Sequence, residues 1–105
     1  MTADRRQARA AYKERTPEAG IYAVRRDGAV WVGASADLEK IGNQLGFSLR
    51  TGRHPNRALQ SACADGDFEM EVVEVLPPTA DRLARDLKLR DRLDHWIEKL
   101  GASRL

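Results

Sequence analysis

Residues 20–35 read GIYAVRRDGAVWVGAS, and this stretch predicts a β-hairpin. Apolar residues alternate with other residues on both sides of Asp27-Gly28, as expected for paired strands. Asp-Gly is a strong two-residue hairpin turn, because both positions tolerate a positive φ. We therefore expect a first strand over Gly20–Arg26 and a return strand over Ala29–Gly33.

After the hairpin the sequence predicts two helices. Ser35 is a candidate N-cap for the first helix. Its apolar residues recur at the i, i+3, i+4 spacing of one buried stripe, formed by Leu38, Ile41, Leu45 and Leu49. Residues 51–55 (TGRHP) break this helix. A second, short helix is expected from about Asn56 to Gly66, and it carries Leu59 and Cys63.

A third strand and a last helix complete the predicted order. Phe68–Val72 alternates strictly, and an apolar extension to Leu76 ends at two prolines. Thr79 is a candidate N-cap for a helix that runs to about Leu100 and stops at Gly101. The apolar positions of this helix are Leu83, Leu87, Leu89, Leu93, Trp96, Ile97 and Leu100.

Length and composition predict one globular domain. The chain has 105 residues, of which 42% are hydrophobic and 32% charged. Residues 1–18 are expected to form an N-terminal helical arm, and residues 19–105 the domain. Cys63 is the single cysteine, so no internal disulfide is possible. No segment resembles a signal peptide or a membrane span, and we expect a reducing, cytoplasmic location.

Basic and acidic residues occupy different parts of the sequence. The net charge of +2 and the pI near 9.0 are only mildly basic. From position 40 to 57 there is no acid, and the basic or histidine residues are Lys40, Arg50, Arg53, His54 and Arg57. Acids gather from Asp65 to Glu74. This separation could give a one-sided positive surface or ordinary solvated faces, and charge alone leaves both interpretations open.

The hairpin also carries a recognisable pair of motifs. Gly20-Ile21-Tyr22, followed by Trp31-Val32-Gly33, resembles the paired signature that names the GIY-YIG nucleases. The resemblance spans roughly residues 20–100 and continues in order through GAS (33–35), DLEK (37–40), GRH (52–54), LQ (59–60), FE (68–69) and WI (96–97). It is similar to homing-endonuclease-type members. It implies an α+β fold, with a small three-stranded mixed sheet, the N-terminal hairpin plus one later strand, flanked by helices.

The resemblance also implies an activity, which is the cleavage of one DNA strand with a single divalent metal ion. Tyr22 matches the first catalytic tyrosine, which helps to activate water, and His54 matches a histidine of some members. The second tyrosine, the arginine and the metal-binding glutamate of the family fall on Trp31, Ile41 and Leu93. A basic or histidine residue one helical turn after the arginine falls on Leu45. Such a reaction needs oxygen ligands for the metal and positive charge beside the phosphate. The apolar replacements therefore favour a degenerate site, without a metal.

Three functions remain open at this point. The leading hypothesis is a non-cleaving DNA-binding or DNA-associated module. It would hold DNA weakly and without sequence specificity through Lys40, Arg50, Arg53 and Arg57. The second is an active endonuclease with an altered site, which would need Mg²⁺ or Mn²⁺ and side chains such as Asp91 and Asp94. The third is a protein-interaction or homodimerisation subunit that uses the apolar former cleft. We also expect Ile41 and Leu93 to face the same region and to be substantially buried, by the fold or by a second chain.

Overall fold

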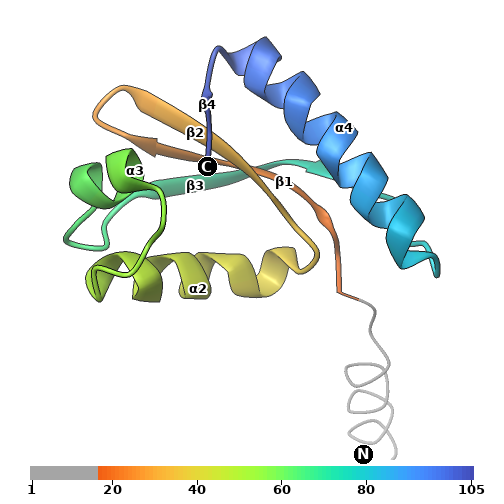
Figure 1. The fold of residues 1–105 in the computed structure, drawn as a ribbon, viewed down its shortest axis with the longest axis horizontal. Coiled ribbons are helices and arrows are strands. Elements are labelled where there is room, and N and C mark those ends of the chain that lie inside the picture. Colours follow the sequence, from red (N-terminus) through yellow and green to blue (C-terminus); the bar gives the residue numbers. More distant parts are fainter. Residues whose placement is uncertain (1–16) are drawn as a thin grey trace, which may run out of the picture.

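The computed structural model describes residues 17–105. The expected helical arm, residues 1–18, lies outside the described part of the chain except for its last two residues. The elements follow in the order β1 (Gly20–Arg26), β2 (Ala29–Ser35), α2 (Leu38–Arg50), α3 (Arg57–Ala62), β3 (Glu69–Val75), α4 (Arg82–Leu100) and β4 (Ser103–Arg104) (Figure 1).

The predicted hairpin is confirmed. β1 and β2 pair antiparallel in a continuous register from Gly20↔Ser35 to Arg26↔Ala29. Asp27 (φ 51°) and Gly28 (φ 84°) both have a positive φ, which is the geometry of a turn that matches the twist of the two strands. The return strand runs two residues further than predicted, to Ser35.

The sheet has four strands in the order β3-β1-β2-β4, so the predicted number of three was wrong. β3 pairs antiparallel with β1, and β4 pairs parallel with β2, which makes the sheet mixed. After Gly101 the chain turns back along the outer edge of β2, where Leu105 N donates a 2.9 Å hydrogen bond to the carbonyl oxygen of Val32. This pairing satisfies backbone groups that an open edge would leave exposed. A two-residue strand is too short to show alternation in a sequence.

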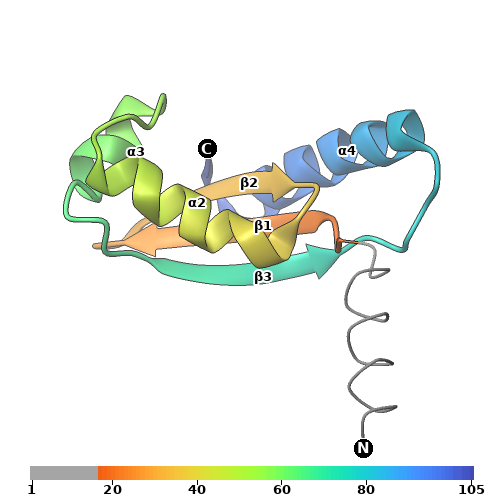
Figure 2. The same ribbon diagram turned by 90° about the horizontal axis from the view of Figure 1, so that it is seen from below.

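Helices cover both faces of the sheet (Figures 1 and 2). On one face, α2 and α3 enclose a first apolar cluster, which contains Tyr22, Val24, Trp31, Leu38, Leu45, Leu49, Leu59 and Cys63. On the other face, α4 encloses a second cluster, which contains Ala19, Ile21, Ala23, Val32, Leu76, Leu89 and Leu93. Alternate residues of β1 therefore enter different clusters, and the strand is buried on both sides. The free thiol of Cys63 is buried.

Both predicted N-caps were placed two residues too early. Asp37 caps α2 and accepts a 3.4 Å hydrogen bond from Lys40 N, while Ser35 Oγ accepts one from Asp37 N. Asp81 caps α4, and Thr79 Oγ1 accepts a bond from Asp81 N. In each case a hydroxyl shapes the turn and a carboxylate caps the helix, where the helix dipole favours negative charge.

The long helix α4 buries only part of its apolar content. Leu89 and Leu93 are buried, and Gly101 (φ 59°) ends the helix as predicted. Leu83 and Leu87 are exposed, at 69% and 58%. These two leucines lie one turn apart and are rotated away from the sheet-facing stripe. Within residues 17–105, no helix is both long enough and apolar enough to cross a membrane.

Candidate nucleic-acid interface

The two signature motifs meet where Tyr22 faces Gly33 across the hairpin. Tyr22 is only 2% exposed. A Cβ added to Gly33 would lie 2.6 Å from the Tyr22 hydroxyl oxygen and 2.7 Å from its Cζ. Real Cβ atoms do not approach other atoms so closely, so the phenol ring occupies the space that glycine leaves. Packing against Tyr22 therefore explains why position 33, the glycine of the second motif, has no side chain.

The surroundings of the Tyr22 hydroxyl disfavour ionisation. Burial raises the pKa of Tyr22 to about 12. The hydroxyl is therefore neutral at physiological pH. A general base needs a pKa near the working pH, and this shift moves the phenol further from it.

The family positions around Tyr22 are filled by packed apolar side chains. Trp31 and Leu45 are buried in the same cluster as Tyr22, and Ile41 is partly buried against it. Leu105 also packs there, because β4 brings it beside the middle of β2. The chain thus covers these side chains itself. The protein-interaction hypothesis requires them at the surface, and the structure does not place them there.

Leu93 lies on the other side of the sheet. It belongs to the cluster beneath α4, whereas Ile41 packs against the cluster beneath α2. The expectation that Ile41 and Leu93 face the same region was therefore wrong, although both are at least partly buried. The reason is that α2 and α4 pack on opposite faces of the sheet, so matching positions along the sequence do not converge in space.

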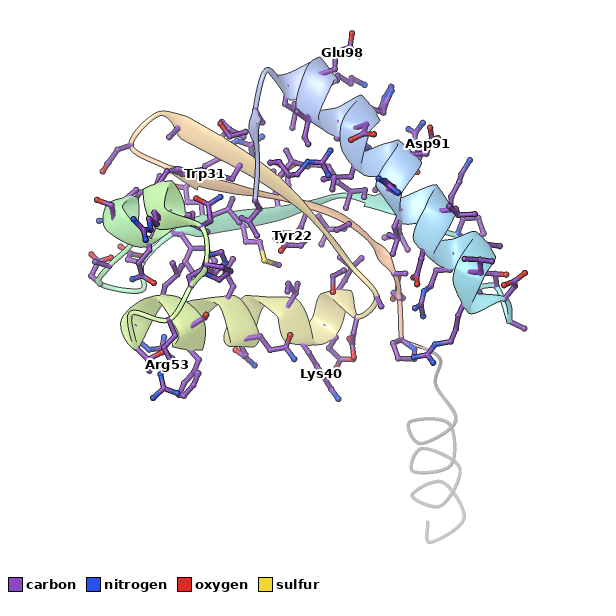
Figure 3. All side chains as sticks on the ribbon, viewed as in Figure 1. Tyr22, Trp31, Lys40, Arg53, Asp91 and Glu98 are labelled. Atoms are coloured by element: carbon purple, nitrogen blue, oxygen red, sulfur yellow. The ribbon has the colours of Figure 1, made fainter. Side chains whose placement is uncertain are left out.

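The residues present do not fit the divalent metal that the family implies. A metal at this fold's site would need a carboxylate, and the matching position holds Leu93 in an apolar environment. Among residues 17–105, no group of three His, Cys, Asp or Glu side chains is arranged to hold a metal ion. Asp91 and Asp94 are exposed on α4, and Asp94 pairs with Arg104. Figure 3 shows Asp91 on the far side of the sheet from Tyr22 and Lys40.

His54 shapes the loop between α2 and α3. Its Nδ1 accepts a 3.0 Å hydrogen bond from Asn56 N, and its own backbone N–H donates to Gln60 Oε1 at 3.1 Å. Gln60 Nε2 in turn donates to the carbonyl oxygen of Leu49 at 2.7 Å. These bonds fix the loop against the end of α2. In this structure the imidazole therefore organises the backbone that presents Arg53.

The four predicted phosphate contacts are all exposed: Lys40, Arg50, Arg53 and Arg57. Figure 3 shows Lys40 and Arg53 pointing away from the sheet on the outer side of α2. Arg50 takes another direction, since its stem packs against Gly66, where an added Cβ would lie 2.2 Å from Arg50 Cγ. Sequence reasoning missed an exposed aromatic ring on the same helix, Phe47, which is 61% exposed.

The predicted acidic block is divided between the hairpin tip, where Asp65 and Asp67 lie, and β3, which carries Glu69, Glu71 and Glu74. Arg26 binds Asp65 through two 3.1 Å hydrogen bonds, and Asp27 and Asp67 complete the group. The hydrogen bond from Arg26, followed by the backbone N–H of Asp67, lowers the pKa of Asp65. Arg26, at the end of β1, therefore partly neutralises Asp65 and its neighbours Asp27 and Asp67. They leave the outer side of α2 free of the acidic block.

The fold and the signature motifs of this chain are GIY-YIG-like. The chain is similar to the catalytic domain of the homing endonuclease I-TevI, a GIY-YIG enzyme, with 25% identity and a TM-score of 0.66 over 83% of this chain and 97% of that one. It is also similar to a point variant of the catalytic domain of the intron endonuclease I-TevI, with 28% identity and a TM-score of 0.66 over 80% of this chain and 84% of that one. No protein-family model matches the chain, and no curated protein sequence does.

Proposed function

We propose that this chain is a GIY-YIG-like domain that binds DNA without cleaving it. The packing around Tyr22 carries this proposal. The Tyr22 hydroxyl has a pKa of about 12, and the adjoining positions hold Trp31, Ile41 and Leu45. None of these three side chains can stabilise a phosphodiester transition state by charge or bind a metal.

Affinity for DNA would come from phosphate contacts on the side of α2 and the loop that follows it. Lys40, Arg53 and Arg57 are exposed there, with Arg50 beside them. Phosphate contacts release counterions and do not depend on base sequence, so they give a weak general affinity that falls with salt. We expect a log–log slope of about −0.9 for each neutralised phosphate.

The proposal is tested by measuring binding and cleavage on the same DNA. Fluorescence anisotropy with a labelled duplex at several salt concentrations measures affinity, and nicking of supercoiled plasmid with Mg²⁺ or Mn²⁺ measures activity. We expect salt-dependent binding and no nicking. Metal-dependent nicking that disappears in Tyr22→Phe would establish the active endonuclease instead.

A matched pair of variants tests whether DNA binding depends on where the cations lie or only on the net charge of the protein. One variant removes three cations next to α2: Arg50→Gln, Arg53→Gln and Arg57→Gln. The other removes three exposed cations from α4, on the opposite face of the sheet: Arg82→Gln, Lys88→Gln and Arg90→Gln. We expect the first variant to bind all duplexes more weakly with a flatter salt slope, and the second to stay close to the parent. Equal losses in both variants would mean that net charge, and not this surface, holds the DNA.

A further inference from the structure

The solvent side of α2 carries four exposed side chains, and only one of them was proposed above as a phosphate contact. They are Lys40, Asn43, Gln44 and Phe47, and they follow the i, i+3, i+4, i+7 spacing of one helical face. This face lies opposite the stripe of Leu38, Leu45 and Leu49 that packs on the sheet. We call the four residues the outer face of α2.

The outer face is open to a large partner. In Figures 1 and 2, α2 lies at the periphery of the molecule, with its other side against the sheet. An α-helix with its side chains is about 10–12 Å in diameter, which matches the roughly 12 Å width of the DNA major groove. Arg53 points outward on the same side as Lys40, beyond the end of the helix (Figure 3).

The chemistry of the outer face favours DNA over a protein partner. Phe47 is an isolated apolar ring among polar and cationic side chains, whereas protein interfaces group several apolar residues around such a ring. Asn and Gln side chains can make paired hydrogen bonds to adenine in the major groove, and a phenyl ring can contact a thymine methyl group. No acid occurs from Lys40 to Arg57, and the exposed Glu39 lies at the start of α2, one turn before Asn43.

We propose that the outer face of α2 enters the major groove of duplex DNA and gives a preference for A·T base pairs. Asn43 and Gln44 read adenine, Phe47 packs against a neighbouring thymine methyl group, and Lys40 and Arg53 hold the flanking phosphates. This inference rests on the proposed DNA binding and adds base reading to it. The preference would be modest, because one bidentate contact is worth on the order of tenfold in affinity.

The test begins with selection of bound sequences from a randomised duplex pool by the unaltered chain. The dissociation constant is then measured by anisotropy for the selected duplex and for a duplex with its A·T pairs replaced by G·C. We expect the parent to bind the selected duplex about tenfold more tightly. In Asn43→Ala/Gln44→Ala, and to a lesser degree in Phe47→Ala, this ratio should fall towards one. Their affinity for the G·C duplex and their salt slope should stay unchanged.

A control variant on α4 tests whether loss of any exposed apolar side chain changes the preference for A·T pairs. Leu87→Ala removes an equally exposed apolar side chain from α4 and should keep the tenfold ratio. If the parent binds all duplexes equally, or if the Asn43 and Gln44 variant weakens binding to all of them alike, the base-reading inference is overturned while the proposed DNA binding stands. If the parent binds no duplex, both are overturned. If Phe47→Ala changes the oligomeric size of the protein, the base-reading inference is overturned, and Phe47 contacts a protein instead.

Discussion

The carboxylate of Glu74 on β3 accepts a 2.8 Å hydrogen bond from the indole Nε1 of Trp96 on α4. Arg92 Nε donates to the same carboxylate at 2.8 and 3.0 Å. The edge strand β3 is thus joined to α4, the helix that packs on β1 and β2. A partly buried tryptophan N–H that finds an acceptor is the usual arrangement.

Replacement of this acceptor should destabilise the fold. In Glu74→Ala the indole N–H and the guanidinium of Arg92 both lose their partner, and we expect a loss of roughly 1–3 kcal/mol in the free energy of unfolding. The control is Glu71→Ala, which breaks the more exposed 2.7 Å pair with Arg25 and should cost about 0–1 kcal/mol. Urea unfolding measures both. Equal losses would contradict a special role for Glu74.

The same carboxylate should make stability depend on acid pH. Burial raises the pKa of Glu74, but the hydrogen bonds from Trp96 and Arg92, together with the charge of Arg92, outweigh burial and leave the pKa below its usual value of 4.5. A lowered pKa in the folded state means that the contribution is complete above pH 4.5 and is lost as pH falls through the folded value. Urea midpoints at pH 7 and pH 3.5 should therefore differ less in Glu74→Gln than in the parent. An unchanged difference would show that other carboxylates dominate the loss of stability at acid pH.

Two glycine-to-alanine substitutions should have opposite effects. Gly33→Ala places a methyl group 2.6 Å from the Tyr22 hydroxyl oxygen, and we expect a loss of about 1–3 kcal/mol. Gly42→Ala, inside α2, meets only Met70 at 3.8 Å and should add up to about 1 kcal/mol through helix propensity. Thermal melting of the two variants checks the signs. If Gly33→Ala is neutral, the phenol ring must be free to move away from β2.

A carboxylate introduced at the position of the family's metal ligand should destabilise the protein. Leu93→Glu puts a charge into the apolar cluster beneath α4, and we expect a cost on the order of 3 kcal/mol. The matched control is Leu87→Glu, which makes the same change on the same helix at an exposed site and should stay within about 0.5 kcal/mol. Differential scanning fluorimetry with and without Mg²⁺ measures both. Recovery of the Leu93→Glu stability by Mg²⁺ would show that this position can still form a metal site.

The sequence predicted the parts of the fold that depend on local chemistry. Asp27-Gly28 specifies its turn through two positive φ angles, and the stripe from Leu38 to Leu49 specifies α2. The N-caps were misplaced because Ser35 and Thr79 bond to the caps, Asp37 and Asp81, and not to the helix. The strand β4 was missed because its pairing with Trp31 and Val32 is a long-range contact.

The candidate site was harder to predict because it depends on which face of the sheet each helix covers. Matching residues to the family placed Ile41 and Leu93 in one cleft, whereas they lie in different apolar clusters. The basic residues of the run without acids are exposed, and their role in binding DNA stays a prediction. Phe47 was missed, but its rotation of about 180° from the buried stripe of α2 was a usable signal.

The short strand β4 leaves the sheet with two unlike edges. Within the described residues, β4 shields the outer side of β2, and β3 forms the opposite edge. That opposite edge carries Glu69, Glu71 and Glu74, and its register with β1 shifts between Ile21 and Tyr22. Two copies that met along β3 would bring like charges together across an irregular strand. The acidic side chains and irregular pairing of β3 therefore disfavour edge-to-edge pairing of two copies, even at high protein concentration.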